Sequence, residues 1–381
     1  MTNILVVGQT PPPYHGQAIM IEEMLKGNYK DIRLLHVRMH FSKETGEVGR
    51  FQLGKVFHLF FVVLKIYFYR FRFKTKVLYY PPAGPYNVPF LRDIVILSLT
   101  RFLFKKVVFH FHASGASMLY ERLPGVLKFF FRKCYFYPDA GLRLSEFNPD
   151  DPGFIKAKKE WIVPNGVADH YSAIPVKKES SSALAGGRPC GCCRILYVGI
   201  LQEVKGILVL LEACRVLESR GVDFKLHVVG AWESEGFNKQ VMQKIKTYKL
   251  ENRIVFEGVL SGEKKFEQYR HADIFCYPTF HKSETFGIVL LEAMQFSLPV
   301  VATRWRGVQS VVKDGETGFL VPTEDSTALA EKLELLANDP VLRQKMQKKG
   351  RDLYLREYTV EKFHRNMEAV FLSLVPGAQA K

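Results

Sequence analysis

The segment that decides the fold spans residues 284–303 and reads ETFGIVLLEAMQFSLPVVAT. Its first part predicts a helix opened by Phe286-Gly287, because an apolar run follows these two residues. After a turn, residues 299–303 form a short apolar run that is typical of a buried strand. A helix that leads through a turn into a buried strand fits a parallel α/β sheet.

Two carboxylates, Glu284 and Glu292, lie eight positions apart and flank the start of this helix. The free backbone N–H groups and the positive dipole of a helix start suit a phosphate, and Gly287 lets it approach the backbone. We expect Glu292, about two turns into the helix, to accept hydrogen bonds from two ribose hydroxyls, and Glu284 to hold the attached sugar. The pattern favours a nucleotide-sugar site. It also fits a helix with a charged N-terminus and a solvated face.

Short apolar runs alternate with longer helical patterns in both halves of the chain, which predicts two doubly wound α/β domains. The predicted strands are 3–8, 32–38, 77–81, 106–112, 140–145 and 160–164 in the first half, and 194–200, 224–230, 253–258, 273–278, 299–303 and 318–321 in the second. Residues 168–193 break the pattern with Ser-rich and Gly/Pro-rich stretches. We therefore expect domains over residues 1–175 and 194–360, a linker over 176–193, and ligands in a cleft at the carboxyl ends of the strands.

Five short motifs follow one another in order between residues 277 and 321. They are Tyr277-Pro278-Thr279, Ser283-Glu284-Thr285-Phe286-Gly287, Glu292-Ala293-Met294, Pro299-Val300-Val301-Ala302-Thr303, and Asp314-Gly315 with Thr317-Gly318-Phe319-Leu320-Val321. This ordered set closely resembles glycosyltransferase family 4, whose E-x7-E motif Glu284 and Glu292 match. The resemblance is strong over residues 190–335 and thinner before them. It implies the GT-B fold, in which two Rossmann-like domains face a cleft and a C-terminal helix, here in residues 361–381, crosses back to the first domain.

The resemblance also implies roles for individual residues. Lys205, followed by glycine, reaches the diphosphate of the sugar donor, while Glu284 and His112 orient the sugar, so these three are the candidate catalytic residues. The candidate donor-binding residues are Gly16, Ser283, Phe286, Gly287, Ile288 and Glu292, with Gly230 and Val259 in two loops that we expect to contact the nucleobase. The glycines of these two loops equally fit plain strand ends. His110, one pleat from His112, fits a buried supporting residue.

Two departures from the family pattern affect the phosphate site. Many relatives carry an arginine where this chain has Ile200, so one phosphate contact is missing or is supplied by Arg304 or Arg306. Residues 305–310 also lack the two glycines and the following glutamate of many relatives, which alters the positions of Arg306 and Ser310.

The composition describes a globular protein of a reducing compartment. A chain of 381 residues with 47% hydrophobic residues is long enough for two separate cores. Six cysteines over this length form no disulfide framework. Cys190, Cys192 and Cys193 cluster, yet no second Cys/His pair at metal-ligand spacing follows, so we expect no metal and no other cofactor. The first predicted strand begins at once, without a basic signal region, which favours the cytoplasm.

Positive charge is concentrated between residues 51 and 140, where 14 Lys and Arg stand against three acidic residues, a local net charge of +11. Aromatic residues interleave with these charges, above all in residues 57–76 and 128–136. Together they suit an anionic membrane surface at the inner face of the cell membrane, whereas a buried helix with snorkelling lysines is the alternative. The uncharged run 56–64 is too short to span a membrane. No nucleic-acid motif is visible, so we expect no nucleic-acid partner.

These observations predict a retaining, metal-independent glycosyltransferase. It would move a sugar from a nucleoside diphosphate, with UDP as the expected nucleotide, to a hydroxyl of a lipid-linked or membrane-proximal glycan in cell-surface polysaccharide synthesis. Two alternatives stay open. A sugar-nucleotide 2-epimerase or hydrolase shares the GT-B fold, and a membrane- or nucleic-acid-binding protein with an inactive cleft needs no catalysis.

Overall fold

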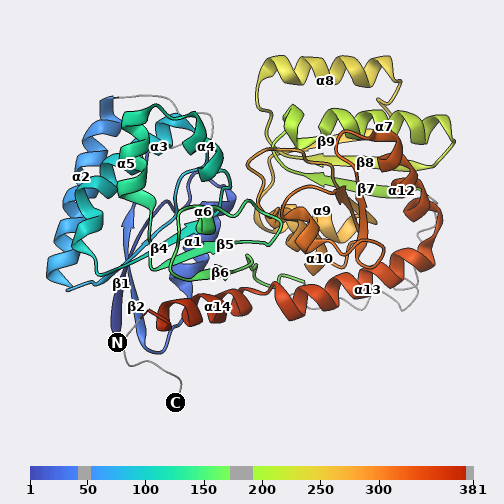
Figure 1. Ribbon diagram of the computed structural model, residues 1–381. Helices are drawn as coiled ribbons and strands as arrows, with labels where there is room; N and C mark the ends of the chain where they lie inside the picture. The colour runs from blue at the N-terminus through green and yellow to red at the C-terminus, as the bar shows by residue number, and fades with distance from the viewer. Residues whose placement is uncertain (42–52, 172–191, 375–381) are drawn as a thin grey trace. The chain divides into compact units, whose positions relative to one another are not determined.

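The computed structural model describes residues 1–41, 53–171 and 192–374. The chain divides into two compact units, one formed by Met1–Gly166 with Val360–Lys381 and the other by Val167–Thr359. Each unit contains one six-stranded sheet flanked by helices (Figure 1). Almost all of the predicted linker, residues 176–193, lies outside the described residues. Cys190 also lies outside them.

The first unit is built on a parallel sheet with the strand order β2-β1-β3-β4-β5-β6. Its strands are β1 (Thr2–Gly8), β2 (Ile32–Arg38), β3 (Val77–Tyr80), β4 (Lys106–Phe111), β5 (Ala140–Arg143) and β6 (Glu160–Ile162). Its helices are α1 (Gly16–Lys26), α2 (Leu53–Arg72), α3 (Asn87–Thr100), α4 (Ala116–Arg122), α5 (Gly125–Tyr135), α6 (Asp151–Phe154) and α14 (Val360–Leu372), and a 3-10 turn, η2 (Arg101–Leu103), follows α3.

The second unit is also built on a parallel sheet, with the strand order β12-β11-β10-β7-β8-β9. Its strands are β7 (Cys193–Val198), β8 (Phe224–Val229), β9 (Ile254–Gly258), β10 (Ile274–Tyr277), β11 (Val300–Thr303) and β12 (Gly318–Val321). Its helices are α7 (Ile207–Ser219), α8 (Glu235–Thr247), α9 (Gly262–His271), α10 (Ile288–Gln295), α11 (Val308–Val311), α12 (Ser326–Asn338) and α13 (Pro340–Glu357).

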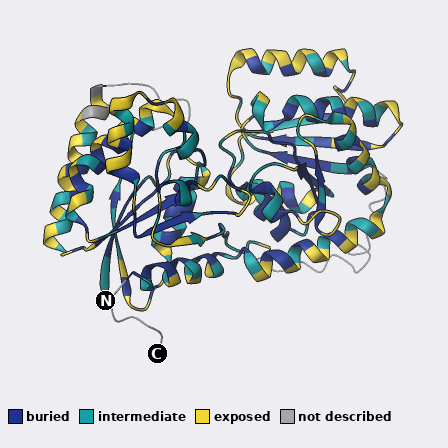
Figure 2. Ribbon diagram, viewed as in Figure 1, coloured by how far each residue is buried: buried dark blue, intermediate teal, exposed yellow. Residues whose placement is uncertain are grey.

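The strands lie in the core of each unit, and the exposed residues lie mainly on the outer faces of the helices (Figure 2). All twelve predicted strands are present, and their ends lie within two residues of the predicted ends. The prediction succeeds because strands covered on both faces are apolar along their whole length. The two doubly wound sheets confirm the predicted fold class. In each sheet the loops that follow the parallel strands gather at one edge, where ligands bind in such folds.

The last helix, α14, belongs to the first unit although the preceding helix, α13, belongs to the second. Phe363 and Phe371 are buried in the first unit, and the ring of Phe371 packs edge-on against Tyr79 at a centroid distance of 6.0 Å. The ring of His364 forms a hydrogen bond of 2.8 Å with the carbonyl oxygen of Glu23 in α1. The predicted return of the C-terminal helix to the first domain is therefore confirmed.

Candidate functional site

The loop after β7 places Lys205 beside the end of β10. Residues Glu203–Lys205 form one turn of 3-10 helix, and Gly206 follows with a φ of 81° at the start of α7. A Cβ at Gly206 would lie 2.0 Å from the carbonyl oxygen of Pro278, so only glycine lets the two loops pack this closely. This packing fixes Lys205 next to the segment that carries Glu284.

Lys205 forms an ion pair with Glu284, the first of the two predicted carboxylates. The Lys205 Nζ lies 2.5 Å from Oε2 of Glu284, and the two side chains are 16% and 10% exposed. The Tyr277 hydroxyl, at the end of β10, donates to the same oxygen at 2.7 Å. Burial disfavours the ionised carboxylate, but the charge of Lys205 and the hydrogen bonds from Lys205 and Tyr277 outweigh it and hold the pKa of Glu284 below its ordinary value. Glu284 is therefore ionised at neutral pH.

The helix start that was predicted as a phosphate site is present. Gly287 has a φ of 80°, and α10 begins at the next residue, Ile288. The side chain of Phe286 is only 1% exposed and packs edge-on against Tyr358 at 5.8 Å, so only its backbone is available to a ligand. Ser283 and Ile288 are partly exposed on either side of this turn.

Glu292 is the fifth residue of α10, so it lies little more than one turn beyond the helix start. The predicted separation of about two turns is therefore wrong. Lys265 Nζ donates to Oε1 of Glu292 at 2.6 Å, and the Tyr269 hydroxyl donates to Oε2 at 2.8 Å. Because each carboxylate oxygen has two lone pairs, both oxygens keep an acceptor position for a hydroxyl group.

Sequence reasoning missed the side chains that hold the two carboxylates. Lys265 and Tyr269 are four positions apart on α9 and so share one helix face, but nothing in the sequence pairs that face with α10. Tyr277 stands in one of the family motifs at the carboxyl end of a predicted strand. Its position at the carboxyl end of a strand was the feature of the sequence that could have predicted its contact with Glu284.

The loops expected to contact the nucleobase follow β8 and β9. A Cβ at Gly230, which has a φ of 155°, would lie 1.8 Å from the carbonyl oxygen of Gly199, so close packing requires this glycine. The N–H of Gly230 donates to the carbonyl of Gly258 at 2.8 Å. The side chain of Val259 is 73% exposed. The contacts of Gly230 therefore support the alternative in which this glycine simply ends a strand. The side chain of Val259, in contrast, is open to solvent.

The two arginines considered as replacements for the missing phosphate contact have different surroundings. Arg304 forms an ion pair of 2.5 Å with Asp314 on the surface. Burial lowers the pKa of His281, and the positive charges of Lys205 and Arg306 both add to this shift. Arg306 and Lys205 therefore both lie within electrostatic reach of His281, whereas Arg304 is paired with Asp314.

In the first unit, Gly16 and His112 follow β1 and β4 at the carboxyl edge of the sheet. Gly16 is exposed and begins α1, where the ring of His15 caps the helix by accepting a 3.3 Å hydrogen bond from the Ala18 N–H. Burial lowers the pKa of His112 to about 3, with a contribution from nearby His15, so His112 is neutral at pH 7. His112 also contacts Tyr79, a residue that the sequence did not single out.

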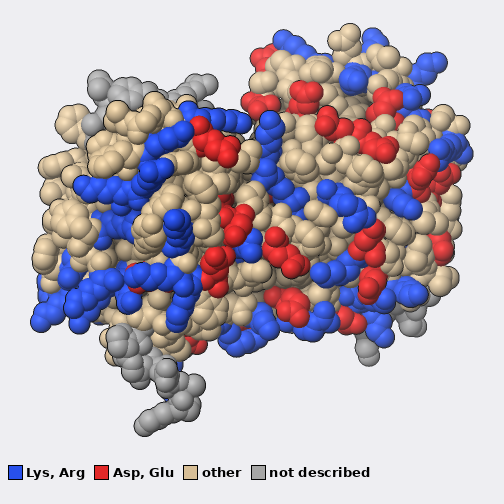
Figure 3. Space-filling view, viewed as in Figure 1, with Lys and Arg blue, Asp and Glu red and all other residues tan. Residues whose placement is uncertain are grey.

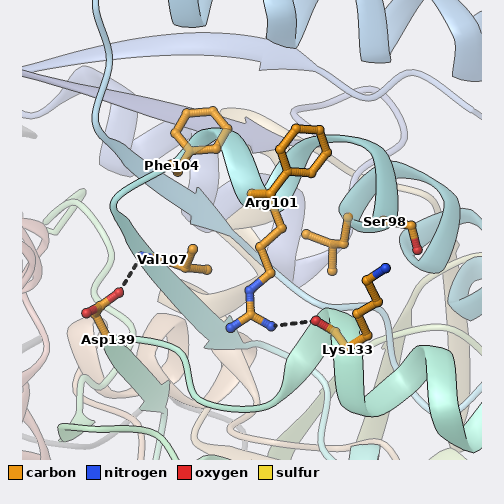
Figure 4. Close-up of a pocket in the computed structure, with 8 residues that line it drawn as sticks. Ser98, Arg101, Phe104, Val107, Lys133 and Asp139 are labelled. Atoms are coloured by element: carbon orange, nitrogen blue, oxygen red, sulfur yellow. Dashed lines mark hydrogen bonds between the residues drawn. The ribbon is translucent and has the colours of Figure 1, made fainter.

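A cavity of about 300 Å³ lies at the opposite, amino edge of the first sheet (Figure 4). Arg101, one of its lining residues, donates to the carbonyl oxygens of Lys133, Cys134 and Phe136 at 3.3, 2.5 and 2.6 Å. Asp139, also in the lining, accepts hydrogen bonds from Val107 and two lysines. The polar groups of this cavity hold the fold together, and the cavity lies apart from His112.

Comparison with known proteins identifies the family of the second unit. Residues 193–353 match the family described as glycosyl transferases group 1. The capsular polysaccharide biosynthesis glycosyltransferase CapM of Staphylococcus aureus is 30% identical over 186 residues, which cover 49% of this chain and 47% of CapM. A phosphatidyl-myo-inositol mannosyltransferase of Mycobacterium leprae is 36% identical over 185 residues, 48% of this chain and 46% of that protein. The matches span about half the length of these curated relatives.

Solved structures resemble the chain over almost its whole length. A glycosyltransferase from Rickettsia africae superposes with a TM-score of 0.73 at 18% identity and covers 99% of both chains. Anabaena HepE in complex with UDP superposes with a TM-score of 0.73 at 16% identity and covers 98% of this chain and 100% of HepE. At these identities the likeness establishes the GT-B fold alone. Residues 193–353 thus match the glycosyl transferases group 1 family, in agreement with the resemblance to glycosyltransferase family 4.

Proposed function

We propose that the protein is a retaining, metal-independent glycosyltransferase. It moves a sugar from a nucleoside diphosphate to a hydroxyl of a lipid-linked or membrane-proximal glycan in cell-surface polysaccharide synthesis. The observation that carries the proposal is the largely buried Lys205–Glu284 ion pair beside the start of α10. The relatives CapM and the mannosyltransferase are named for capsule and phosphatidyl-inositol glycosylation, which supports this substrate class.

The donor diphosphate is assigned to Lys205 and the first N–H groups of α10, because both offer positive charge or partial positive charge. Glu284 neutralises the Lys205 ammonium in the structure, and a diphosphate bound here competes for the same ammonium. As the glycosidic bond breaks, negative charge develops on the leaving diphosphate, and Lys205 stabilises it. We take UDP as the first nucleotide to test, since HepE, a protein of the same fold, binds it.

The two carboxylates are assigned to hydroxyl groups of the donor. Glu284 accepts hydrogen bonds from the sugar, and Glu292, oriented by Lys265 and Tyr269, accepts them from the ribose. In the retaining reaction the acceptor oxygen attacks the anomeric carbon on the face from which the diphosphate departs. The bond from that carbon to the diphosphate oxygen breaks, and the leaving phosphate takes the proton of the acceptor hydroxyl. This sequence requires no protein base.

The lipid side of the proposal rests on α2. One stripe of this helix carries large apolar side chains that are 47–70% exposed: Phe57, Phe61, Leu64, Phe68 and Phe71. Their spacing of alternately four and three positions puts them on one face, while the opposite face buries Val62 and Ile66. The alternative of a buried helix with snorkelling lysines therefore does not hold for this stripe.

Lys65 and Arg72 are exposed on the same helix, and Figure 3 shows lysine and arginine side chains gathered over the first unit. Among the described residues, no helix is long and apolar enough to cross a membrane. Exposed aromatic residues beside basic ones suit a helix that lies in the headgroup layer of an anionic bilayer. We therefore include peripheral binding to the inner face of the cell membrane, and a cytoplasmic location, in the proposal.

Thermal unfolding with a panel of nucleotide-sugars tests the donor assignment. A ligand at 100 times its Kd adds about 2.7 kcal/mol to the free energy of unfolding, so a true donor gives a measurable shift. Release of free nucleoside diphosphate is then measured with and without a lipid-linked glycan. Release that requires the glycan supports transfer, whereas release without it indicates a hydrolase and an altered sugar an epimerase. If no nucleotide-sugar shifts the transition, the proposal is wrong.

A further inference from the structure

Three helices of the first unit, α2, α3 and α5, lie side by side on one face of the first sheet, with α3 in the middle (Figure 1). The Tyr67 hydroxyl of α2 donates to the carbonyl of Leu99 in α3 at 2.8 Å. On the other side, the Ser98 hydroxyl of α3 lies 3.1 Å from Sγ of Cys134 in α5. Buried side chains of all three helices pack into one core against the sheet, so their exposed sides all face away from it.

The exposed side of α3 is apolar along its whole length. Every residue of this helix is described, and its large exposed side chains, each 41–47% exposed, are Val88, Leu91, Val95 and Leu99. Their spacing of three or four positions places them in one stripe. The two charged residues of the helix, Arg92 and Asp93, form an ion pair of 2.7 Å in which the Asp93 side chain is fully buried. A helix that is apolar on all sides is normally covered on all sides, and α3 is covered on only one.

The neighbouring helices continue this apolar surface on both sides of α3. On one side lies the α2 stripe that runs from Phe57 to Phe71. The turn η2 and the helix α5 add large apolar side chains that are 36–71% exposed: Phe102, Val126, Phe129 and Phe130. Together the exposed residues of α2, α3, η2 and α5 form the three-helix face. Single exposed apolar residues are ordinary, but a contiguous apolar surface on three helices marks an interaction site.

The exposed charges of the three-helix face have one sign. The segments α2, α3, η2 and α5 contain a single acidic residue, the buried Asp93. Exposed basic side chains lie on the two outer helices: Lys65, Arg72, Arg132 and Lys133. Contact between two copies of this face would bring like charges together, which is unfavourable. The headgroups of an anionic bilayer neutralise such charges, and its acyl chains cover an apolar stripe between them.

From this distribution we infer that the three-helix face inserts into an anionic bilayer as one surface, with the α3 stripe below the headgroups among the acyl chains. The inference rests on the membrane binding included in the proposed function and deepens it. The helix α2 is one edge of the binding surface, α3 is its centre and α5 is its other edge. The contact is apolar along α3, which has no exposed charge among its described residues, and electrostatic along the two outer helices.

The experiment measures how strongly the full-length protein partitions onto phosphatidylcholine vesicles that contain phosphatidylglycerol, at one low ionic strength. A triple variant, Leu91→Ser with Val95→Ser and Leu99→Ser, removes the α3 stripe and leaves the net charge unchanged. The matched control makes the same three substitutions on α12 and α13 of the second unit, at residues that are 41–75% exposed: Leu335, Val341 and Leu355.

A second measurement reports the depth of insertion and does not depend on the folding of the triple variant. Val95→Trp places an indole on the α3 stripe. Lipids brominated on their acyl chains quench an indole that they touch, so the emission added by this substitution should be quenched on binding. Val341→Trp, on the second unit, is the control, and its added emission should not be quenched.

We expect the α3 triple variant to partition at least about tenfold more weakly than the wild type, which corresponds to about 1.4 kcal/mol, and the control variant to partition like the wild type. Circular dichroism checks that each variant is folded. A folded α3 variant that partitions like the wild type overturns the inference, and so does an unquenched Val95→Trp. In that case the protein binds the vesicles by charge and α2 alone, and the membrane binding of the proposed function remains.

Two further outcomes are distinguished by the same proteins. If the wild type sediments as a dimer in solution and the α3 variant as a monomer, the three-helix face binds a second copy of the chain, and the inference is overturned. If no nucleotide-sugar binds the wild type, the glycosyltransferase assignment fails while the vesicle result stands.

Discussion

The ammonium of Lys205 and the carboxylate of Glu284 lie 2.5 Å apart although 79 positions separate them in the chain. The contact joins the loop after β7 to the loop before α10, and Tyr277 completes it by donating to the same carboxylate oxygen. Because the pair is largely buried, removing either partner leaves the other charge without compensation. The same two residues are assigned to the donor diphosphate and the donor sugar. Their substitution therefore tests structure and function together.

Replacing Lys205 by alanine should lower kcat by at least about 100-fold, because the leaving diphosphate loses its neutralising charge. Lys205→Arg should recover little activity, since the guanidinium differs from the ammonium in shape and in hydrogen-bond geometry. Steady-state kinetics with a nucleotide-sugar and acceptor measure both. Lys282→Ala is the matched control, because Lys282 is an exposed lysine two positions from Glu284. If Lys205→Ala turned over at nearly the wild-type rate, Lys205 would not neutralise the leaving diphosphate, and Arg306 would be the next candidate for that role.

Replacing Glu292 by alanine should weaken nucleoside diphosphate binding by about 1–3 kcal/mol, because two ribose hydroxyls lose their acceptor. Lys265→Met should weaken binding less, since it frees the carboxylate to rotate but leaves it in place. Isothermal titration with the nucleoside diphosphate measures both affinities. Lys264→Met, at the exposed neighbouring position, serves as the control. Unchanged affinity in a folded Glu292→Ala variant would exclude the ribose role.

The Glu284 carboxylate should make stability depend on pH. Its pKa is lowered in the folded protein, so the stabilisation is present above the ordinary carboxyl value of 4.5 and is lost as the pH falls through the folded pKa. Glu284→Gln should therefore lower the free energy of unfolding at pH 7 by about 1–3 kcal/mol, with the difference shrinking in acid. Denaturant unfolding between neutral and acidic pH checks this. Glu235→Gln, at an exposed position, should change the curve little; a pH-independent difference for Glu284→Gln would contradict the ion-pair origin.

Changing Lys65, Arg72 and Lys74 to serine should release the protein from anionic vesicles, since each cation near such a surface contributes about 1 kcal/mol. Arg70 is left in place because its Nε donates to the carbonyl of Leu103 at 2.7 Å and supports the fold. Added salt should act in the same direction, because charge attraction is screened over about 8 Å at physiological ionic strength. Vesicle co-sedimentation at low and high salt measures both effects.

The matched control for this surface removes three exposed lysines of the second unit by changing Lys239, Lys246 and Lys264 to serine. It lowers the net charge of the protein equally and should leave vesicle binding nearly unchanged. Nucleotide affinity should be preserved in both triple variants, because neither changes an assigned donor residue. If the wild-type protein does not co-sediment with anionic vesicles, the α2 stripe does not bind a membrane.

The sequence by itself determined the elements of the fold. Periodicity and turn residues located all twelve strands, since these patterns reflect local geometry and burial of single segments. The order of the family motifs identified Lys205, Glu284 and Glu292, and the matched family and fold agree with that resemblance. The helix start after Gly287 was also predictable from the sequence. A glycine readily adopts the positive φ found there, and this preference depends on a single residue.

Only the tertiary structure decided which side chains meet. Tyr277 of β10 contacts one carboxylate, and Lys265 and Tyr269 of α9 contact the other. Sheet pairing brings Tyr79 to His110 and His112. The side chain of Phe286, which the sequence predicted to contact the ligand, is buried in the structure, whereas the aromatic stripe of α2 is exposed. Side-chain proximity between distant segments depends on how helices pack on a sheet. No pattern within a single segment encodes that packing, so the partners of the site residues had to be observed.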